Sequence, residues 1–253
     1  MLRIHLNNDL GYYSENAGIT WKKMPNVGVG GNGRGAITII GDEKYRFFHT
    51  TQNGILYSDD YGRNWFESKG LVGEQFGIFV EESDPMIVYT YSLIKKSEDN
   101  PGQYVLGVSG DGGKSFYAKP ISDYDGSNFS NKIAYIGEGK IALCAGNNGI
   151  YVVSKFGEKM EKIETVQYCK TIGFGAPEKK GKSNTLYIYG RPLYYDPEGL
   201  YLSQDEGYTW VLVNHENLYG GTGDGNFVVG DMNIFGTFYM STLGYGILYG
   251  KLK

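Results

Sequence analysis

Proline, cysteine, histidine and arginine are scarce in this chain, and the shortage of the last three argues against two kinds of site. The 253 residues include 7 prolines, 2 cysteines, 3 histidines and five arginines, and the net charge is −4. The histidines show no ligand spacing and the Cys-x-x-Cys zinc patterns are absent, so we expect no metal site. The acidic balance and the few arginines argue against a nucleic-acid-binding surface.

Long apolar runs are missing as well. No stretch of 18 apolar residues occurs, so we expect no membrane-spanning segment. The first eight residues, from Met1 to Asn8, contain neither an apolar core nor a cleavage site, so no signal peptide is predicted. Cys144 and Cys169 fall on predicted strands of adjacent repeats; a disulfide between them is open, but we expect buried free thiols.

One eight-residue motif, by contrast, recurs. The pattern Ser-x-Asp-x-Gly-x-Thr-Trp, known as the Asp-box, begins at Ser14, Ser58, Ser109 and Ser203. These starts are 44, 51 and 94 residues apart, and the last gap is about twice the unit. A degenerate copy, Tyr151 to Gly157, lies midway and is interpreted as keeping the serine, Ser154, and the glycine. A repeat of about 40 to 50 residues that is rich in short strands predicts a β-propeller with one blade per repeat.

The residues that recur in the box are explained by structural rather than catalytic roles. Glycine supplies positive φ in a tight turn, and serine with aspartate or asparagine can hydrogen-bond the backbone of that turn. The closing aromatic residue can fill the wedge between blades. The residues to which we assign this role are Ser14, Asn16, Gly18 and Trp21; Ser58, Asp60, Gly62 and Trp65; Ser109, Asp111, Gly113 and Phe116; and Ser203, Asp205, Gly207 and Trp210.

The repeat predicts an all-β chain that forms one Asp-box propeller domain over residues 1–253. About six blades are visible, which form either a closed six-bladed ring or an arc of a seven-bladed one. We expect a partial first blade at 1–25, blades near 36–68, 76–119, 131–165 and 169–213, and a partial last blade at 225–253.

Two other sequence patterns could indicate cofactor binding or catalysis. Gly28 to Gly33 matches the dinucleotide fingerprint, but a predicted strand, Ala36 to Ile40, follows where a helix should begin, so we expect an interblade loop and no cofactor. Paired carboxylates would serve glycoside hydrolysis, yet nothing in the sequence brings two of them together. The candidates outside the boxes are Asp84, Asp123, Asp125, Asp196, Glu216, Asp224 and Asp231.

Two loops combine aromatic and polar residues. Sugar rings stack their apolar faces on aromatic planes while their hydroxyls seek polar neighbours. The candidate carbohydrate-binding residues are Tyr194 and Tyr195 in one loop, and His215, Tyr219 and Asp224 in the other. The alternative is that these tyrosines pack at the rim of the sheets. The sequence identifies no catalytic residue to accompany these candidate binding residues.

From about Thr171 onward the sequence becomes more specific than a generic Asp-box protein. The distinctive runs are Ile172 to Pro177, Leu186 to Gly190, Gly199 to Trp210, Tyr219 to Gly223, Gly230 to Thr242 and Gly244 to Gly250. In these runs the sequence resembles the C-terminal end of glycoside hydrolase family 74. The resemblance implies two seven-bladed propellers facing across an open cleft, xyloglucan or a related β-glucan as substrate, a second propeller domain or chain completing that cleft, and secretion.

The departures from that family bear on catalysis. The family's acid lies in a Gly-Asp-Ile-Gly-Gly-like motif that is absent here, and Asp231 aligns elsewhere. We therefore expect a xyloglucanase-like propeller that forms one wall of a β-glucan cleft but hydrolyses poorly alone. A non-catalytic carbohydrate- or protein-binding propeller is the alternative. A sialidase is disfavoured because the five arginines include no early Arg-Ile-Pro-type motif.

Overall fold

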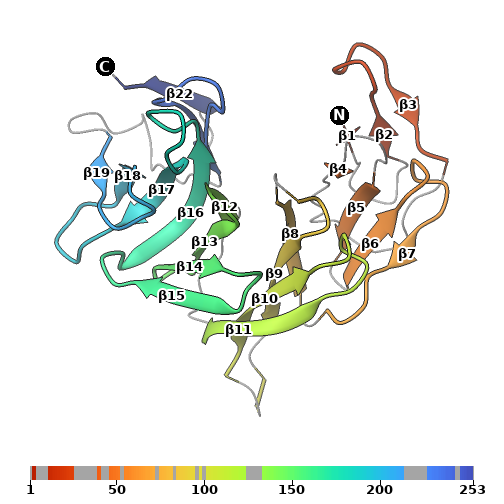
Figure 1. The fold of residues 1–253 in the computed structure, drawn as a ribbon, viewed down its shortest axis with the longest axis horizontal. Coiled ribbons are helices and arrows are strands. Elements are labelled where there is room, and N and C mark those ends of the chain that lie inside the picture. The colour runs from red at the N-terminus through yellow and green to blue at the C-terminus, as the bar shows by residue number, and fades with distance from the viewer. Residues whose placement is uncertain are drawn as a thin grey trace. The chain divides into compact units, whose positions relative to one another are not determined.

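The structure is a computed structural model. It describes residues 2–3, 11–25, 39–40, 46–51, 54–71, 74–81, 84–94, 97–98, 101–123, 133–213, 227–242 and 246–252. These residues form β-strands and turns in six antiparallel sheets (Figure 1). No helix occurs among them, and hence none that could cross a membrane. The all-β prediction is confirmed.

The chain divides into two compact units, residues 1–124 and 125–253. We call each sheet a blade and number the blades in chain order. Unit 1 holds blades 1 to 3. Blade 1 is β1 (Leu2–Arg3), β2 (Tyr12–Tyr13) and β3 (Lys22–Lys23); blade 2 is β4 (Ile39–Ile40), β5 (Arg46–Thr51), β6 (Gly54–Ser58) and β7 (Phe66–Glu67); blade 3 is β8 (Glu74–Val80), β9 (Val88–Ile94), β10 (Gln103–Ser109) and β11 (Tyr117–Asp123).

Unit 2 holds blades 4 to 6. Within every blade the strands follow one another as neighbours, so each is a simple up-and-down meander. Blade 4 is β12 (Ile133–Gly137), β13 (Lys140–Cys144), β14 (Ile150–Ser154) and β15 (Lys159–Ile163); blade 5 is β16 (Tyr168–Gly175), β17 (Thr185–Arg191), β18 (Gly199–Ser203) and β19 (Val211–Leu212); blade 6 is β20 (Val228–Gly230), β21 (Thr237–Ser241) and β22 (Ile247–Lys251).

Blade 5 is covered on both faces, which explains why its middle strands are nearly continuous apolar runs. Leu186, Ile188 and Tyr201 join a buried cluster with blade 4. Side chains that point the other way join a second cluster with blade 6, and they include Tyr187, Tyr189, Leu200 and Leu202. We call the face that a blade turns toward the next blade in chain order its trailing face.

Glycines let the inner strands of blades 5 and 6 approach closely. A Cβ atom on Gly173 of β16 would lie 1.8 Å from the carbonyl oxygen of Val228 in β20. A Cβ atom on Gly175 would lie 2.6 Å from the Cα atom of Gly230. Any side chain at these two positions would therefore force the two strands apart.

The two cysteines form a disulfide, so the expectation of free thiols is wrong. Cys144 ends β13 and Cys169 lies near the start of β16, with a Cα–Cα distance of 5.4 Å. The amide of Cys169 donates to the carbonyl of Gly146, at 2.9 Å, which brings the end of one blade beside the start of the next. This backbone contact puts the two side chains within disulfide reach.

The degenerate Asp-box differs from its sequence interpretation. In the intact boxes glycine lies four residues after serine, and the residue before it has positive φ, for example 62° at Glu206. In the degenerate copy, Phe156 has φ 55° and precedes Gly157. Counting back four residues from Gly157 gives Val153, which is fully buried. Val153, not Ser154, therefore occupies the serine position, and the serine is lost as well as the aspartate and aromatic residue.

Blade 6 repeats the register of blade 5 but leaves its trailing face open. Leu200 pairs with Tyr189 in blade 5, and Ile247 pairs with Ser241 at the same place in blade 6. Leu200 is fully buried, whereas Ile247 is 66% exposed, and Tyr249, two residues on, is 60% exposed. The described residues of unit 2 place no further sheet on this face.

Candidate carbohydrate-binding loop

The four intact boxes share one hydrogen-bond pattern that is confined to the turn. Each serine Oγ accepts from the glycine amide at 2.8–2.9 Å and donates to the Asp or Asn Oδ1 at 2.7–3.0 Å. Burial raises the pKa of the Asp111 carboxyl, but hydrogen bonds from Ser115, Ser109 and backbone amides outweigh it and hold the pKa below its ordinary value. Asp60 and Asp205 are held in the same way.

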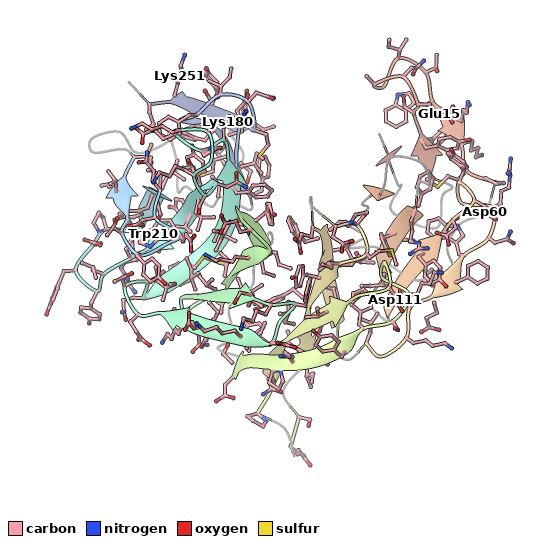
Figure 2. The ribbon with its side chains drawn as sticks, in the orientation of Figure 1. Glu15, Asp60, Asp111, Lys180, Trp210 and Lys251 are labelled. Carbon is pink, nitrogen blue, oxygen red and sulfur yellow. A yellow bond between two sulfur atoms is a disulfide. The ribbon has the colours of Figure 1, made fainter. Side chains whose placement is uncertain are left out.

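The closing aromatic residues are not equally buried. Phe116 is 6% exposed and belongs to a core cluster of unit 1, whereas Trp21 is 40% exposed. Trp210 packs against the core between blades 4 and 5, and its Nε1 donates to the carbonyl of Gly207 at 2.8 Å (Figure 2). Asp60 and Asp111, also labelled there, lie in the turns of their own boxes. The box carboxylates of Asp60, Asp111 and Asp205 are therefore engaged within their own turns.

The most exposed aromatic side chains of the described residues lie in the loop 192–198, which joins β17 to β18. Tyr195 is 94% exposed and Tyr194 is 72% exposed. Their rings stand at 87° to each other with centroids 5.2 Å apart. Leu193 beside them is 54% exposed and is not among the residues predicted to bind sugar. Together the three side chains form an apolar surface at the tip of the loop.

Hydrogen bonds fix this loop to blade 5. The Asp196 carboxylate accepts from the Leu193 amide at 2.9 Å, and the Asp196 amide donates to the Leu193 carbonyl at 3.0 Å. The Tyr201 hydroxyl donates to the carbonyl of Pro197 at 2.6 Å. The Gln167 amide donates to the carbonyl of Pro192 at 2.8 Å. Asp196 therefore holds the turn that displays the tyrosines.

Burial and two nearby carboxylates, Asp196 and Glu198, shift the pKa values of three groups near the loop. Burial, together with the charge of Asp196, raises the pKa of Tyr201 to about 12, so its hydroxyl stays protonated and remains a donor. Burial lowers the pKa of Lys170, and the charge of Glu198 partly offsets this effect. Burial and Glu198 also raise the pKa of Tyr189.

The loop lies at the end of blade 5 opposite its Asp-box. Strand β18 runs from Gly199, next to the loop, to Ser203, which begins the box. The Val213 amide donates to the carbonyl of Leu200 at 2.8 Å, so residue 213 is near the loop end of the sheet. The other predicted sugar contacts, His215, Tyr219 and Asp224, lie outside the described residues, as does the segment from Gly28 to Gly33.

The carboxylates proposed for catalysis mostly hold turns where the structure describes them. Asp84 Oδ1 accepts from the Met86 amide at 2.9 Å, and Asp231 Oδ1 accepts from the Asn233 amide at 2.8 Å. Asp123 ends β11 and is exposed. Asp125, Glu216 and Asp224 lie outside the described residues.

One polar cluster was not predicted from the sequence. Lys140 of blade 4 pairs with Glu206 of the blade 5 box at 2.8 Å, and Ser183 donates to the same carboxylate at 2.9 Å. The hydrogen bond with Glu206 raises the pKa of Lys140. Burial raises the pKa of Glu206, but Lys140 and Ser183 outweigh it and lower that pKa. Because Glu206 occupies a variable position of the box, the motif carried no signal for this ion pair.

Comparison with known proteins finds several that resemble this chain. A model of the BNR/Asp-box repeat matches residues 12–23. The oligoxyloglucan-reducing end-specific xyloglucanase of Emericella nidulans is 28% identical over 96% of this chain and 32% of its own length. A xyloglucanase of a Paenibacillus species is 26% identical over 93% of this chain and 22% of its own length.

Solved structures agree. A glycoside hydrolase family 74 enzyme of Niastella koreensis superposes with a TM-score of 0.78 at 27% identity, over 96% of this chain and 34% of the enzyme. A family 74 xyloglucanase of Xanthomonas campestris shares the fold with a TM-score of 0.75 at 21% identity, over 99% of this chain and 34% of that one. The chain spans between about a fifth and a third of the length of these relatives. It is therefore a β-propeller segment of the glycoside hydrolase family 74 type, with Asp-box repeats.

Proposed function

We propose that this chain binds xyloglucan or a related β-glucan and forms one wall of a glucan cleft. The observation that carries the proposal is the pair of exposed rings, Tyr194 and Tyr195, on a loop fixed by hydrogen bonds. Tyrosine rings offer a large contact area at a low entropy cost, because few side-chain torsion angles are fixed on binding. The names of the relatives, which are xyloglucanases, supply the substrate class.

The proposed role is binding, and hydrolysis would need further residues. Carboxylate oxygens of Asp84, Asp196 and Asp231 accept hydrogen bonds from backbone amides of their own turns. A glycosidase of the usual kind needs one carboxyl group as acid and a second as base or nucleophile across the scissile bond. In the proposed assembly a second propeller domain or chain completes the cleft.

Titration calorimetry with xyloglucan oligosaccharides, together with a reducing-end assay on the polymer, tests this function. We expect binding without release of reducing ends. Tyr195→Ala should weaken binding, whereas Tyr208→Ala should not, because Tyr208 is a 58% exposed tyrosine at the box end of the same blade. Release of reducing ends would show a carboxylate pair in this chain. No binding to the parent chain would contradict the proposal and favour a protein-binding propeller.

A further inference from the structure

Strand β22 ends the sheet of blade 6 one strand early. Blades 2 to 5 have four strands each, whereas blade 6 has three, and within the described residues no strand lies beyond β22. In three other blades the same backbone hydrogen bond, 2.8 Å long, holds the segment outside the box strand. It joins the amide of the residue ten after the box serine to the carbonyl of the residue three before it. These bonds run from Met24 to Gly11, from Ser68 to Ile55 and from Val213 to Leu200.

The open edge of β22 presents backbone groups in that same direction. Ile247 takes the place of Leu200 in the meander, so its carbonyl points to where a fourth strand would lie. The carbonyl of the preceding residue, Gly246, points the other way and accepts from an amide just past the end of β21 at 3.0 Å. Because this direction alternates along a strand, the N–H and C=O groups of Ile247, Tyr249 and Lys251 line the open edge.

The outer strands of the other blades are poor templates for pairing. Strands β3, β7 and β19 have two residues each. Strand β11 contains Pro120 and an irregular register beside it, and β15 carries Lys159, Glu161 and Lys162. Short strands, proline, bulges and charges all keep a sheet edge from pairing with another chain. Strand β22 has five residues and a single charge, Lys251, at its end, so of these outer strands it is the best suited to pair.

We infer that β22 pairs edge to edge with β22 of a second copy of this chain, antiparallel and across a two-fold axis at Tyr249. This inference is independent of glucan binding. The outward backbone groups of one copy then meet those of the other, and all five residues of the strand are paired. Leu248 lies opposite Gly250, a large residue against a small one. The two three-stranded sheets become one continuous sheet.

The side chains on the trailing face fit this register. Tyr249 lies opposite Tyr249 of the other copy, and Ile247 lies opposite Lys251, so two aromatic rings meet and no like charges are opposed. Tyr239 extends the aromatic row, because its ring centroid is 5.5 Å from that of Tyr249. Ile247 and Tyr249 are 66% and 60% exposed, so both are accessible for these contacts.

Sedimentation equilibrium of the whole chain over a concentration series tests the inference. The apparent mass should rise from 28.1 kDa toward twice that value. Tyr249→Lys should raise the dissociation constant about tenfold, because it removes the aromatic pair and opposes two like charges. Lys251→Pro should raise it by a similar factor, because it removes an amide that bonds the other copy, at an edge position that accepts proline. Val211→Lys is the control and should change nothing, because it adds the same charge to the two-residue edge of blade 5, where Val211 is 59% exposed.

Cysteine cross-linking checks the register. The two native cysteines form a disulfide, so a new thiol finds no free thiol in its own chain. Tyr249→Cys should give a disulfide-linked dimer under mild oxidation, because opposed residues of a hydrogen-bonded antiparallel pair lie about 5.5 Å apart. Tyr239→Cys should not, because its two copies would lie three strand spacings apart, about 14 Å.

Several results would overturn the inference. A mass of 28.1 kDa at every concentration would do so, as would a dimer that Tyr249→Lys leaves intact or cross-linking at position 239. A dimer weakened by Tyr249→Lys but not by Lys251→Pro would also overturn it, since the two blades would then stack face to face rather than pair at their edges. Circular dichroism of each variant separates a change in mass from a loss of folding. If Lys251→Pro fails to fold, the two cysteine variants decide.

Discussion

Alanine substitutions at equivalent positions of blades 5 and 6 should differ widely in their effect on stability. Leu200 and Ile247 occupy the same place in the two meanders, yet Leu200 is fully buried and Ile247 is 66% exposed. Leu200→Ala removes packing between two blades and should lower the free energy of unfolding of unit 2 by about 2–5 kcal/mol. About a third of the Ile247 side chain is buried, so Ile247→Ala should cost about 0.5–1 kcal/mol, a third of the value for full burial.

Urea unfolding followed by tryptophan fluorescence measures both values. The chain has 3 tryptophans, and two of them, Trp21 and Trp65, lie in unit 1. In a background with both replaced by phenylalanine, Trp210 reports on unit 2 alone, which matters because the units can unfold separately. Equal losses at Leu200 and Ile247 would refute the reasoning, since they would show that another surface covers the trailing face of blade 6 in solution.

Three further predictions concern the disulfide, a buried histidine and the box serines. Replacing Cys144 and Cys169 by serine should lower the stability of unit 2 by about 3.5 kcal/mol for this loop length, measured by urea unfolding with and without reductant. Burial lowers the pKa of His49 below its ordinary value of 6.5, so the unfolded chain takes up the proton first. The stability of unit 1 should be full above pH 6.5 and fall below it toward the lower folded pKa; a His49→Gln variant should lose this slope in unfolding measured at several pH values. Ser203→Ala should cost about 1–3 kcal/mol, because the buried Ser203 hydroxyl bonds the Gly207 amide, whereas Ser154→Ala should change the unfolding midpoint little.

The propeller class could be predicted from the sequence because the Asp-box is a local device. Its hydrogen bonds join residues no more than four apart, so the eight letters are enough to place a turn between two strands. The ambiguity at Ser154 shows the limit of this reading. A serine one position out of register looked like the box serine, and only the positive φ values at Phe156 and Gly157 identify Val153 instead.

Features that depend on how blades meet could not be predicted. The disulfide requires the end of β13 to lie beside the start of β16, a contact set by the backbone of Gly146. The ion pair of Lys140 and Glu206 joins residues 66 apart in sequence. For the candidate site, the sequence located the tyrosine loop, but the exposure of the rings and their perpendicular planes depend on the turn that Asp196 holds.

Blades 4 and 5 are linked at both ends of the interface between them. The disulfide lies at the end that carries the tyrosine loop, and at the box end Lys140 pairs with Glu206 while the Asn184 amide donates to the carbonyl of Ile136 at 2.7 Å. The platform under Tyr194 and Tyr195 therefore has little freedom to hinge. The proposed glucan binding should therefore involve no closure of the site, and differences in affinity among glycans should arise from dissociation rates rather than from association rates.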